Sequence, residues 1–444
     1  MPTIKRRERD AILLSLQAGL VPRIGLHLIQ VGRKAEVTAL LDDLERIEDG
    51  GATFRIVLGR FGSGKTFFLN LVRTLALQKQ FVVVQADMTM ERRLYSNGGH
   101  ARALYSELMR NLAIKPKPDG GALRNLCEGW ISRVAHNVKA AGGDDNAVKD
   151  QIFEELRDLQ NHVGGFEFSE VLGKYYEGYS TGNDVLQAAA LKWLRAEYTT
   201  KTEAKSDLGV RRIISDENFY DSLKIFAAFC VKAGYAGLLV NVDELVVLSH
   251  RLPNTRARQA NYEALLAIMN DTMQGAVSNI GFIFAGTNEC VEDNRRGLYS
   301  YEALRTRLQQ NQFSREGIVD YSGPVVKLDC LSPEDLFVLL KNIRHVHATG
   351  KRDQYAVPDE ALIALLQKAS ETLGAEFYKT PRDVIRSFVG LLNVLEQNSD
   401  ISWEDLLANQ PLVANTGELS AEEEIEKGIG IADDEDDQLA TLKL

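Results

Sequence analysis

Cysteine is scarce in this chain of 444 residues, and its four cysteines lie far apart, at positions 127, 230, 290 and 330. None of them forms a CxxC pair, so the sequence argues against a disulfide framework and against a cysteine zinc site. The histidines do not cluster with Cys, Asp or Glu at metal-ligand spacing either. Scattered cysteines are typical of a reducing compartment, and we therefore expect a cytoplasmic protein.

Long apolar runs are also missing from the chain. No stretch approaches the roughly 18 apolar residues of a membrane helix, and the charged N-terminus lacks the apolar core of a signal peptide. We find no internal repeat, no G-x-S-x-G motif and no zinc-finger or RNA-binding signature. What remains is an ordinary globular composition, 45% hydrophobic and 26% charged, in a chain long enough for two or three domains.

The net charge of −10 is concentrated at the C-terminus. From Asn415 to Leu444, ten acidic residues stand against Lys427 and Lys443, a net charge of −8, which leaves −2 for the rest of the chain. This segment has no aromatic residue. We therefore predict that residues 411–444 form an acidic tail that is disordered at least in part.

Five β-rich runs alternate with helical patterns, which predicts an α/β fold with a parallel sheet covered on both faces. The runs cover residues 53–58, 81–86, 236–242, 280–285 and 325–328. About 150 residues of mostly helical periodicity separate the second run from the third, whereas a crossover needs only a dozen or so. We therefore predict a helical insertion at about 100–220.

Helical periodicity also dominates both ends of the chain. Residues 1–51 are predicted to form an N-terminal helical segment, and residues 52–330 the α/β core. After Asp329, three helical patterns predict a separate small domain at 331–410. Its first helix opens at Ser332, with Asp335 three positions later, an arrangement typical of a capped helix start.

The segment Gly59-Arg60-Phe61-Gly62-Ser63-Gly64-Lys65-Thr66 matches G-x-x-x-x-G-K-[ST] and is followed by Phe67. It lies between a predicted strand and a predicted helix, as a P-loop should. Glycines let backbone N–H groups wrap a phosphate, and the helix start adds partial positive charge. Lys65 is expected to reach the β- and γ-phosphates, and the Thr66 hydroxyl to bind Mg²⁺.

The third β-rich run ends in two adjacent carboxylates, Asp243 and Glu244. We expect Asp243 to hold Mg²⁺ through water and Glu244 to deprotonate the attacking water. The fourth run leads into Gly286-Thr287-Asn288, where Asn288 or Thr287 is expected to hold that water. No N-K-x-D guanine-reading motif occurs in the chain, which favours ATP over GTP.

With these motifs the chain resembles the AAA+ and related STAND ATPases, especially their initiator-like branch. The resemblance implies a lid with a sensor arginine, for which Arg382 in Tyr378-Lys379-Thr380-Pro381-Arg382-Asp383 is the match. It also implies an arginine finger that reaches a neighbouring subunit of a homo-oligomer. The candidates are Arg305 and Arg307, with Arg295 and Arg296 as further options, although several arginines together are also typical of a solvated helix face.

Further segments resemble the ATP-binding proteins of BREX-type and Shango-like bacteriophage-defence operons. The segments are 18–22, 29–36, 193–195, 234–238 and 299–304, and the resemblance spans about 11–398. It implies an anti-phage role beside a helicase and other operon proteins. In the segment at 29–36, Arg33 is expected either to lie near the nucleotide or to brace the sheet.

Two basic stretches remain to be assigned. His250, Arg251, Arg256 and Arg258 form the first, and the second runs from Lys341 to Arg352. Each is expected either to contact DNA phosphates or to be a solvated helix end. The leading hypothesis is an ATPase acting on DNA or on a helicase-containing complex. The alternative is a nucleotide-gated scaffold with little turnover, and a small-molecule kinase fits less well because a lid arginine has no evident purpose there.

Overall fold

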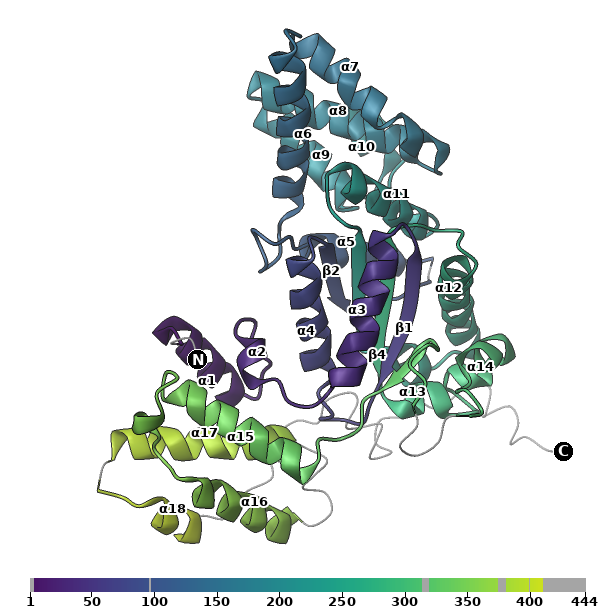
Figure 1. Ribbon diagram of the computed structural model, residues 1–444. Helices are drawn as coiled ribbons and strands as arrows, with labels where there is room; N and C mark the ends of the chain where they lie inside the picture. The colour runs from purple at the N-terminus through teal and green to yellow at the C-terminus, as the bar shows by residue number, and fades with distance from the viewer. Residues whose placement is uncertain (1–3, 96, 314–318, 374–380, 399, 410–444) are drawn as a thin grey trace, which may run out of the picture. The chain divides into compact units, whose positions relative to one another are not determined.

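A five-stranded parallel sheet forms the centre of the α/β part of the chain (Figure 1). The computed structural model describes residues 4–95, 97–313, 319–373, 381–398 and 400–409. The strand order is β2-β3-β4-β1-β5. The strands are β1 (Ala52–Leu58), β2 (Val82–Asp87), β3 (Leu238–Asp243), β4 (Ile280–Gly286) and β5 (Val325–Lys327). Each overlaps one of the five predicted β-rich runs, so the predicted α/β fold with a parallel sheet is confirmed.

The central strands are buried along their whole length. Every residue of β3 and β4 is buried, as expected for parallel strands that are covered on both faces and therefore read as continuous apolar runs. The register places Asp87 of β2 opposite Asp243 of β3, and Val242 opposite Phe284 of β4. The carboxylate that ends β3 therefore lies at the carboxyl end of the sheet, where open α/β sheets bind ligands.

Helices fill the connections between these strands. The predicted helix after the phosphate loop is confirmed as α4 (Lys65–Gln78). The others that flank or follow strands are α3 (Lys34–Glu48), α11 (Phe219–Lys232), α12 (Thr255–Met273), α13 (Asn288–Glu292) and α14 (Glu302–Leu308). In the part of the chain that the structure describes, no helix is long and apolar enough to cross a membrane.

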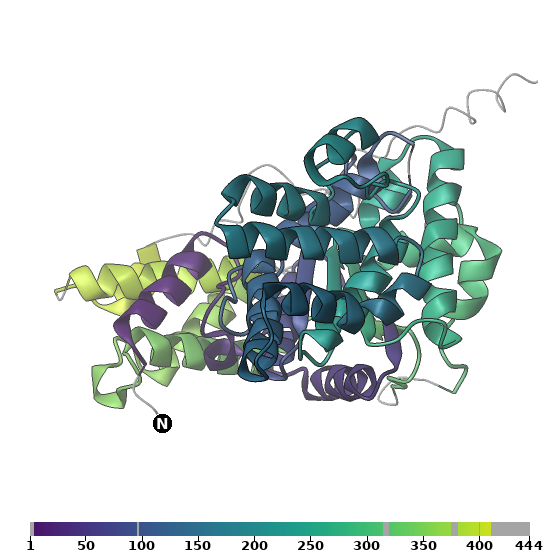
Figure 2. The same ribbon diagram turned by 90° about the horizontal axis from the view of Figure 1, so that it is seen from above.

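A group of helices occupies the long connection between β2 and β3 (Figures 1 and 2). Side-chain caps start three of them: Asp144, Asn183 and Thr200 each accept a hydrogen bond from a backbone N–H of the first turn. Trp130 and Phe168 both pack edge-on against Phe229 at 5.2 and 5.5 Å, which gives the group an aromatic core. Its helices are α5 (His100–Arg110), α6 (Leu123–Ala140), α7 (Asp145–Glu155), α8 (Gly165–Thr181), α9 (Asp184–Leu194) and α10 (Lys201–Leu208).

The chain divides into two compact units. Among the described residues, unit 1 comprises 4–37, 57–71 and those from 326 to 409, and unit 2 comprises 38–56 and 72–325. The phosphate loop therefore belongs to unit 1, and the acidic pair and the helical insertion belong to unit 2. The predicted domain boundaries at residues 51, 330 and 410 stay predictions. The predicted acidic tail at 411–444 lies outside the described residues.

Both ends of the chain contribute to the core of unit 1. Its helices are α1 (Arg6–Gln17), α2 (Leu26–Ile29), α15 (Pro333–His347), α16 (Asp359–Leu373), α17 (Pro381–Gln397) and α18 (Trp403–Asn409). Ile12 of α1, Leu340 of α15 and Phe388 of α17 share one buried apolar cluster. Ser332 and Asp335 form a capping box at the start of α15, which confirms the predicted helix start.

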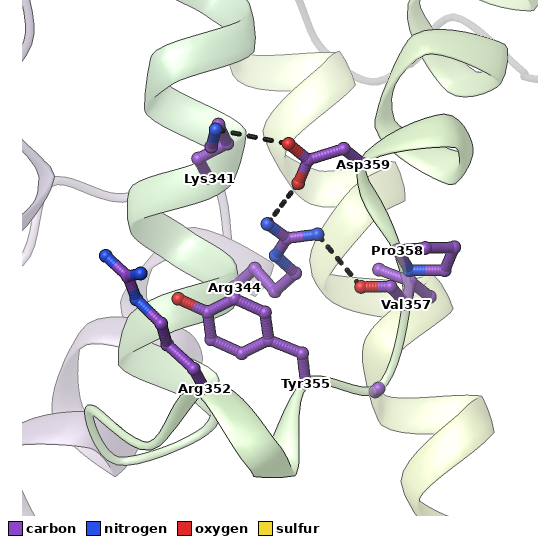
Figure 3. A pocket seen from close by; sticks show the side chains of 8 residues that line it. Lys341, Arg344, Arg352, Tyr355, Val357, Pro358 and Asp359 are labelled. Atoms are coloured by element: carbon purple, nitrogen blue, oxygen red, sulfur yellow. Dashed lines mark hydrogen bonds and ion pairs between the residues drawn. The ribbon is translucent and has the colours of Figure 1, made fainter.

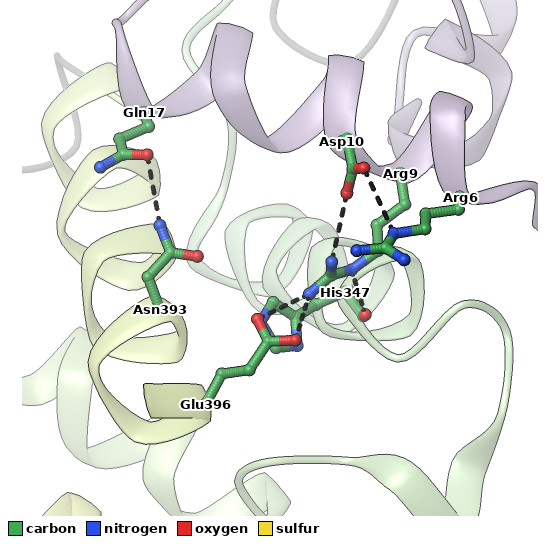
Figure 4. Close-up of polar contacts among 7 residues, drawn as sticks. All are labelled: Arg6, Arg9, Asp10, Gln17, His347, Asn393 and Glu396. Atoms are coloured by element: carbon green, nitrogen blue, oxygen red, sulfur yellow. Dashed lines mark hydrogen bonds and ion pairs between the residues drawn. The ribbon is translucent and has the colours of Figure 1, made fainter. Parts of the chain in front are cut away.

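Polar contacts join α1 to the C-terminal helices at the edge of this core (Figure 4). The Arg9 guanidinium donates to the His347 carbonyl oxygen at 2.7 Å and to the Glu396 carboxylate at 2.7 Å. Asn393 donates to the side-chain oxygen of Gln17 at 3.2 Å. The helix that begins the chain is therefore held by side chains more than 300 positions later in the sequence.

Candidate functional site

The phosphate loop connects β1 to α4 and is shaped by its glycines. Gly62 and Gly64 have φ angles of 75° and 91°, in the left-handed region that glycine adopts without a steric penalty. A Cβ at Gly59 would collide with the Ser63 Oγ and lie 3.0 Å from the Leu328 carbonyl oxygen, so a side chain there would force its neighbours to shift. The loop can therefore turn its backbone N–H groups toward an anion at the start of α4.

Lys65 is held against this loop. Its side chain is 5% exposed, and its Nζ donates to the carbonyl oxygens of Gly59 at 3.0 Å and of Arg60 at 3.1 Å. Thr66, the next residue, is exposed in the first turn of α4. The ammonium group and the hydroxyl thus occupy neighbouring positions at a helix start, which suits a phosphate and a hard cation.

Two arginines from distant parts of the sequence approach the loop within unit 1. The Arg33 guanidinium donates to the carbonyl oxygen of Ser63 at 3.2 Å and to that of Asp329, and it pairs with Glu36 at 3.4 Å. The Arg33 side chain therefore braces the phosphate loop by binding the loop's backbone. The Arg382 guanidinium carbon lies 5.4 Å from the centroid of the Phe61 ring, in the range of a cation–π contact.

Arg382 stands in the first turn of α17, directly after Pro381, as the sequence predicts. It is exposed, and a Cβ at Gly19 would lie 3.3 Å from its Cδ, so α1 and the phosphate loop both border its side chain. Pro381 suits this first position because its missing N–H would have no partner there. The preceding Tyr378-Lys379-Thr380 of the sensor motif lies outside the described residues.

The acidic pair ends β3 in unit 2. Asp243 is 6% exposed, and its Oδ1 accepts the backbone N–H of Glu244 at 2.9 Å. Glu244 has a φ angle of 61°, a left-handed conformation that costs a non-glycine residue about 1–3 kcal/mol. The Leu245 N–H then donates to the Ala285 carbonyl oxygen of β4 at 2.8 Å. The chain therefore turns sharply at Glu244 and is tied at once to the neighbouring strand.

Thr287 and Asn288 follow β4, next to that tie. Thr287 is 1% exposed, and neither its Oγ1 nor the buried Oδ1 of Asn288 has a hydrogen-bond partner among the described residues. A buried polar atom without a partner costs about 1–3 kcal/mol. The two atoms are therefore free to accept a hydrogen bond from a ligand or a water molecule, which is the role predicted for this pair.

A hydrogen-bonded chain of three side chains, of which two are buried and the third is half-buried, lies just beyond the acidic pair, and sequence reasoning missed it. The Ser249 hydroxyl and the His250 Nδ1 are 2.8 Å apart, and the His250 Nε2 and the Asp293 carboxylate are 3.2 Å apart. His250 is 3% exposed, and burial lowers its pKa although Asp293 opposes the shift. The neutral ring thus joins the segment after Glu244 to the end of α13. Ser249 is 1% exposed, which argues against a nucleophilic role.

The first basic stretch, proposed from sequence as a DNA contact or a helix end, is buried at two of its four residues. His250 is buried in the chain just described, and Arg258 is 4% exposed. The Arg258 guanidinium donates hydrogen bonds to the carbonyl oxygens of Leu252 and Pro253, at 2.9 and 3.1 Å. Those interactions hold the loop before α12, so His250 and Arg258 are structural, whereas Arg256 is exposed.

The finger candidates of α14 lie at the surface. Arg305 and Arg307 are both exposed, and Arg307 donates to the Ala303 carbonyl oxygen of its own helix at 2.8 Å. Arg295 is exposed, whereas Arg296 is 4% exposed and is therefore unsuited to reach another subunit. Across the described ranges, no three His, Cys, Asp or Glu side chains gather closely enough to hold a metal ion by themselves.

The model of a family described as "BREX system ATP-binding protein BrxC/D" matches residues 4–411 of the chain. A search of the curated proteins found no match. The family match covers the phosphate loop, the acidic pair, the helical insertion and every helix of unit 1.

Proposed function

The chain belongs to the BREX system ATP-binding protein family, and from that premise we propose that it is a Mg²⁺-dependent, AAA+-like ATPase of an anti-phage defence assembly. The observation that carries the proposal is the strand order. In the sheet, β4 has β1 on one side and β3 on the other. The phosphate loop, Asn288 and the acidic pair therefore follow three consecutive strands of a parallel sheet, whose carboxyl ends are the usual ligand-binding edge.

The binding step uses the groups of the phosphate loop. Lys65 now donates to the carbonyl oxygens of Gly59 and Arg60, and the phosphates of ATP would take over these hydrogen bonds with charge assistance. Bound Mg²⁺ supplies charge neutralisation at the phosphates, and the oxygen donors of Thr66 and Asp243 are ligands of the kind it prefers. Arg33 holds the Ser63 carbonyl oxygen, so the loop is ordered before the nucleotide arrives.

The hydrolytic step needs a base, a group that orients water, and cations for the developing charge. Glu244 is the base in our proposal, and Asn288, whose Oδ1 has no partner among the described residues, orients the water. Arg382 is the sensor arginine, and exposed Arg305 or Arg307 is the finger that serves a neighbouring subunit in a homo-oligomer. Such a cation supplied in trans typically accelerates phosphoryl transfer by about 10³–10⁵.

The test is ATP turnover by the purified chain, alone and with single- or double-stranded DNA, beside Glu244→Gln. We expect turnover to fall by at least about 100-fold in the variant while ATP binding is kept, because the amide cannot accept the proton. Glu263→Gln, an exposed glutamate of α12, is the matched control and should behave as wild type. Turnover that survives in Glu244→Gln would contradict the assignment.

The action we favour is on DNA or on a helicase-containing complex, powered by this turnover. A second candidate is a nucleotide-gated scaffold. The helical insertion favours it, because α6–α10 are a large group of folded helices, anchored on Phe229 of α11 through Trp130 and Phe168, that a partner could bind. Tight ATP binding without turnover, with or without DNA, would support the scaffold and contradict an action powered by ATP hydrolysis.

A further inference from the structure

A surface pocket of about 650 Å³ lies in unit 1, away from the phosphate-loop residues, and no function has been assigned to it so far (Figure 3). It is lined by the second half of α15, by the short 3₁₀ helix Arg352–Gln354 and by the start of α16. Three of its side chains are cationic, Lys341, Arg344 and Arg352, and one is acidic, Asp359. These cations belong to the second basic stretch of the sequence.

The charge of the pocket does not cancel. The Asp359 carboxylate forms an ion pair with the Lys341 ammonium group at 3.2 Å and also accepts a hydrogen bond from the Arg344 guanidinium. These contacts, the hydrogen bond from Arg344 above all, lower the pKa of Asp359, so it stays ionised at neutral pH. Three positive charges against one negative charge leave a net charge of +2 around the cavity, which favours an anion.

Arg344 forms a fixed floor. It is 4% exposed, donates to the Val357 carbonyl oxygen at 2.9 Å, and stacks its guanidinium carbon 4.3 Å from the centroid of the Tyr355 ring. Its buried Nε has no hydrogen-bond partner among the described residues. The Tyr355 hydroxyl is in turn held by the His345 Nδ1 at 2.9 Å. A cation held in this way is preorganised and loses little entropy when an anion binds.

Arg352 differs from the other two cations because it is exposed and makes no ion pair within the described part of the chain. Figure 3 shows its side chain on the other face of the pocket from Asp359, beside Tyr355. The charge of Arg352 also acts on His345 behind the pocket. Burial is the main cause of the lowered pKa of His345, and repulsion from Arg352 is the second. One side of the pocket therefore offers a guanidinium that has only solvent to bind.

We propose that this pocket binds a backbone phosphate of DNA, with Arg352 and Lys341 as the donors to its oxygens and the stacked Arg344–Tyr355 pair as the floor. Guanidinium and ammonium groups are the usual phosphate donors, and a phosphodiester presents two charged oxygens to separate cations. The cavity is also roomy enough for a phosphate with its sugar. The inference rests on the proposed function in one respect, that the assembly acts on DNA.

The test compares neighbouring cations in the full-length chain. Arg352→Ala and Lys351→Ala each remove one charge from adjacent exposed positions, but Lys351 does not line the pocket. Affinity for a labelled DNA duplex is measured by anisotropy between about 50 and 200 mM salt, without nucleotide. We expect Arg352→Ala to weaken binding several-fold and to reduce the salt slope by about 1. Lys351→Ala should change the slope far less, and Arg352→Lys should restore most of it.

Each outcome decides the proposal. Equal losses in Arg352→Ala and Lys351→Ala would reduce the pocket to general surface charge and overturn it. Absence of duplex binding by wild type at low salt would also overturn it, as would Arg352-dependent binding of a polyglutamate peptide in place of DNA. ATP turnover is measured separately on the same proteins. A wild type that binds DNA through Arg352 but hydrolyses no ATP would leave the pocket standing and remove the proposed ATPase.

Discussion

The phosphate loop and the segment after β3 both position charged groups, but they do so by different physical means. The loop uses its own backbone: glycines open it, and its carbonyl oxygens hold Lys65. The segment after β3 uses side chains from elsewhere: Glu244 sits in a left-handed conformation, and buried His250 ties the following turn to Asp293. The hydrogen bonds that hold Lys65 are local in sequence, whereas His250 and Asp293 are more than forty positions apart.

This difference predicts how the two regions respond to substitution. A change in the loop alters a surface that meets the nucleotide, and most of the core beneath it is untouched. A change behind Glu244 removes hydrogen bonds from a mostly buried chain of side chains, so it lowers stability and activity together. The substitutions below are chosen to separate these two responses, from the largest expected effect to the smallest.

Lys65→Ala should give the largest effect. Removing the ammonium group deletes the charge that meets the β- and γ-phosphates in our proposal, and we expect turnover to fall by about 10²–10³. Stability should change little, because Lys65 donates to carbonyl oxygens of its own loop. Phosphate release and urea unfolding measure the two quantities. Lys79→Ala, which removes a surface lysine paired with Glu45, is the control. Turnover above a third of wild type in Lys65→Ala would rule out the proposed phosphate contact.

His250→Ala should affect both stability and turnover. The Ser249 hydroxyl and the Asp293 carboxylate would each lose a partner, at a cost of about 1–3 kcal/mol in the free energy of unfolding. His250 touches no substrate in our proposal and acts as a positioning residue through the Glu244 turn. We therefore expect kcat to fall by about tenfold with KM for ATP unchanged.

The Asn variant provides the control for this prediction. His250→Asn keeps one donor and one acceptor at the position and should recover part of both losses. A His250→Ala protein that unfolds at a lower urea concentration but keeps wild-type kcat would show that the buried chain serves stability alone.

The contrast between the regions also explains what sequence reasoning could and could not predict. The loop was readable because its chemistry needs fixed residue types at fixed spacing, and the strands were readable because burial on both faces produces continuous apolar runs. The Ser249–His250–Asp293 chain left no such signal, since Asp293 stands on another element. The two basic stretches looked alike for the same reason: only tertiary contacts bury Arg258 and leave Arg352 exposed.

Arg33→Lys tests the long-range part of the loop region and should have a smaller effect. The Arg33 guanidinium bridges the carbonyl oxygens of Ser63 and Asp329, and a lysine keeps the charge but not the planar fork. We expect KM for ATP to rise about three- to tenfold with little change in kcat, since the loop would be less ordered before binding. Steady-state kinetics over a range of ATP concentrations gives both constants. An unchanged KM would mean that the glycines alone determine the conformation of the loop before ATP binds.

The smallest expected effect is the pH dependence of stability that His250 produces in the region behind Glu244. Burial lowers the pKa of His250, Arg296 adds to this, and Asp293 and Glu289 oppose it. The unfolded chain, with an ordinary histidine pKa near 6.5, therefore binds more protons than the folded chain as the pH falls. The stability that neutral His250 contributes is fully present above about pH 6.5 and is lost as the pH falls through its folded pKa.

His250→Gln makes this measurable, because glutamine does not titrate. Wild type should exceed the variant in Tm by more at about pH 8 than at about pH 5. His136→Gln, which changes an exposed histidine of α6 in the same unit, should follow wild type at both pH values. Burial also lowers the pKa values of His345 and His347, so wild type should lose stability in acid for reasons other than His250. The difference in Tm between wild type and His250→Gln isolates the contribution of His250. A difference in Tm that stays constant with pH would mean that folding does not shift the pKa of His250, and a difference that grows in acid would mean that a charged His250 pairs with Asp293 in the fold.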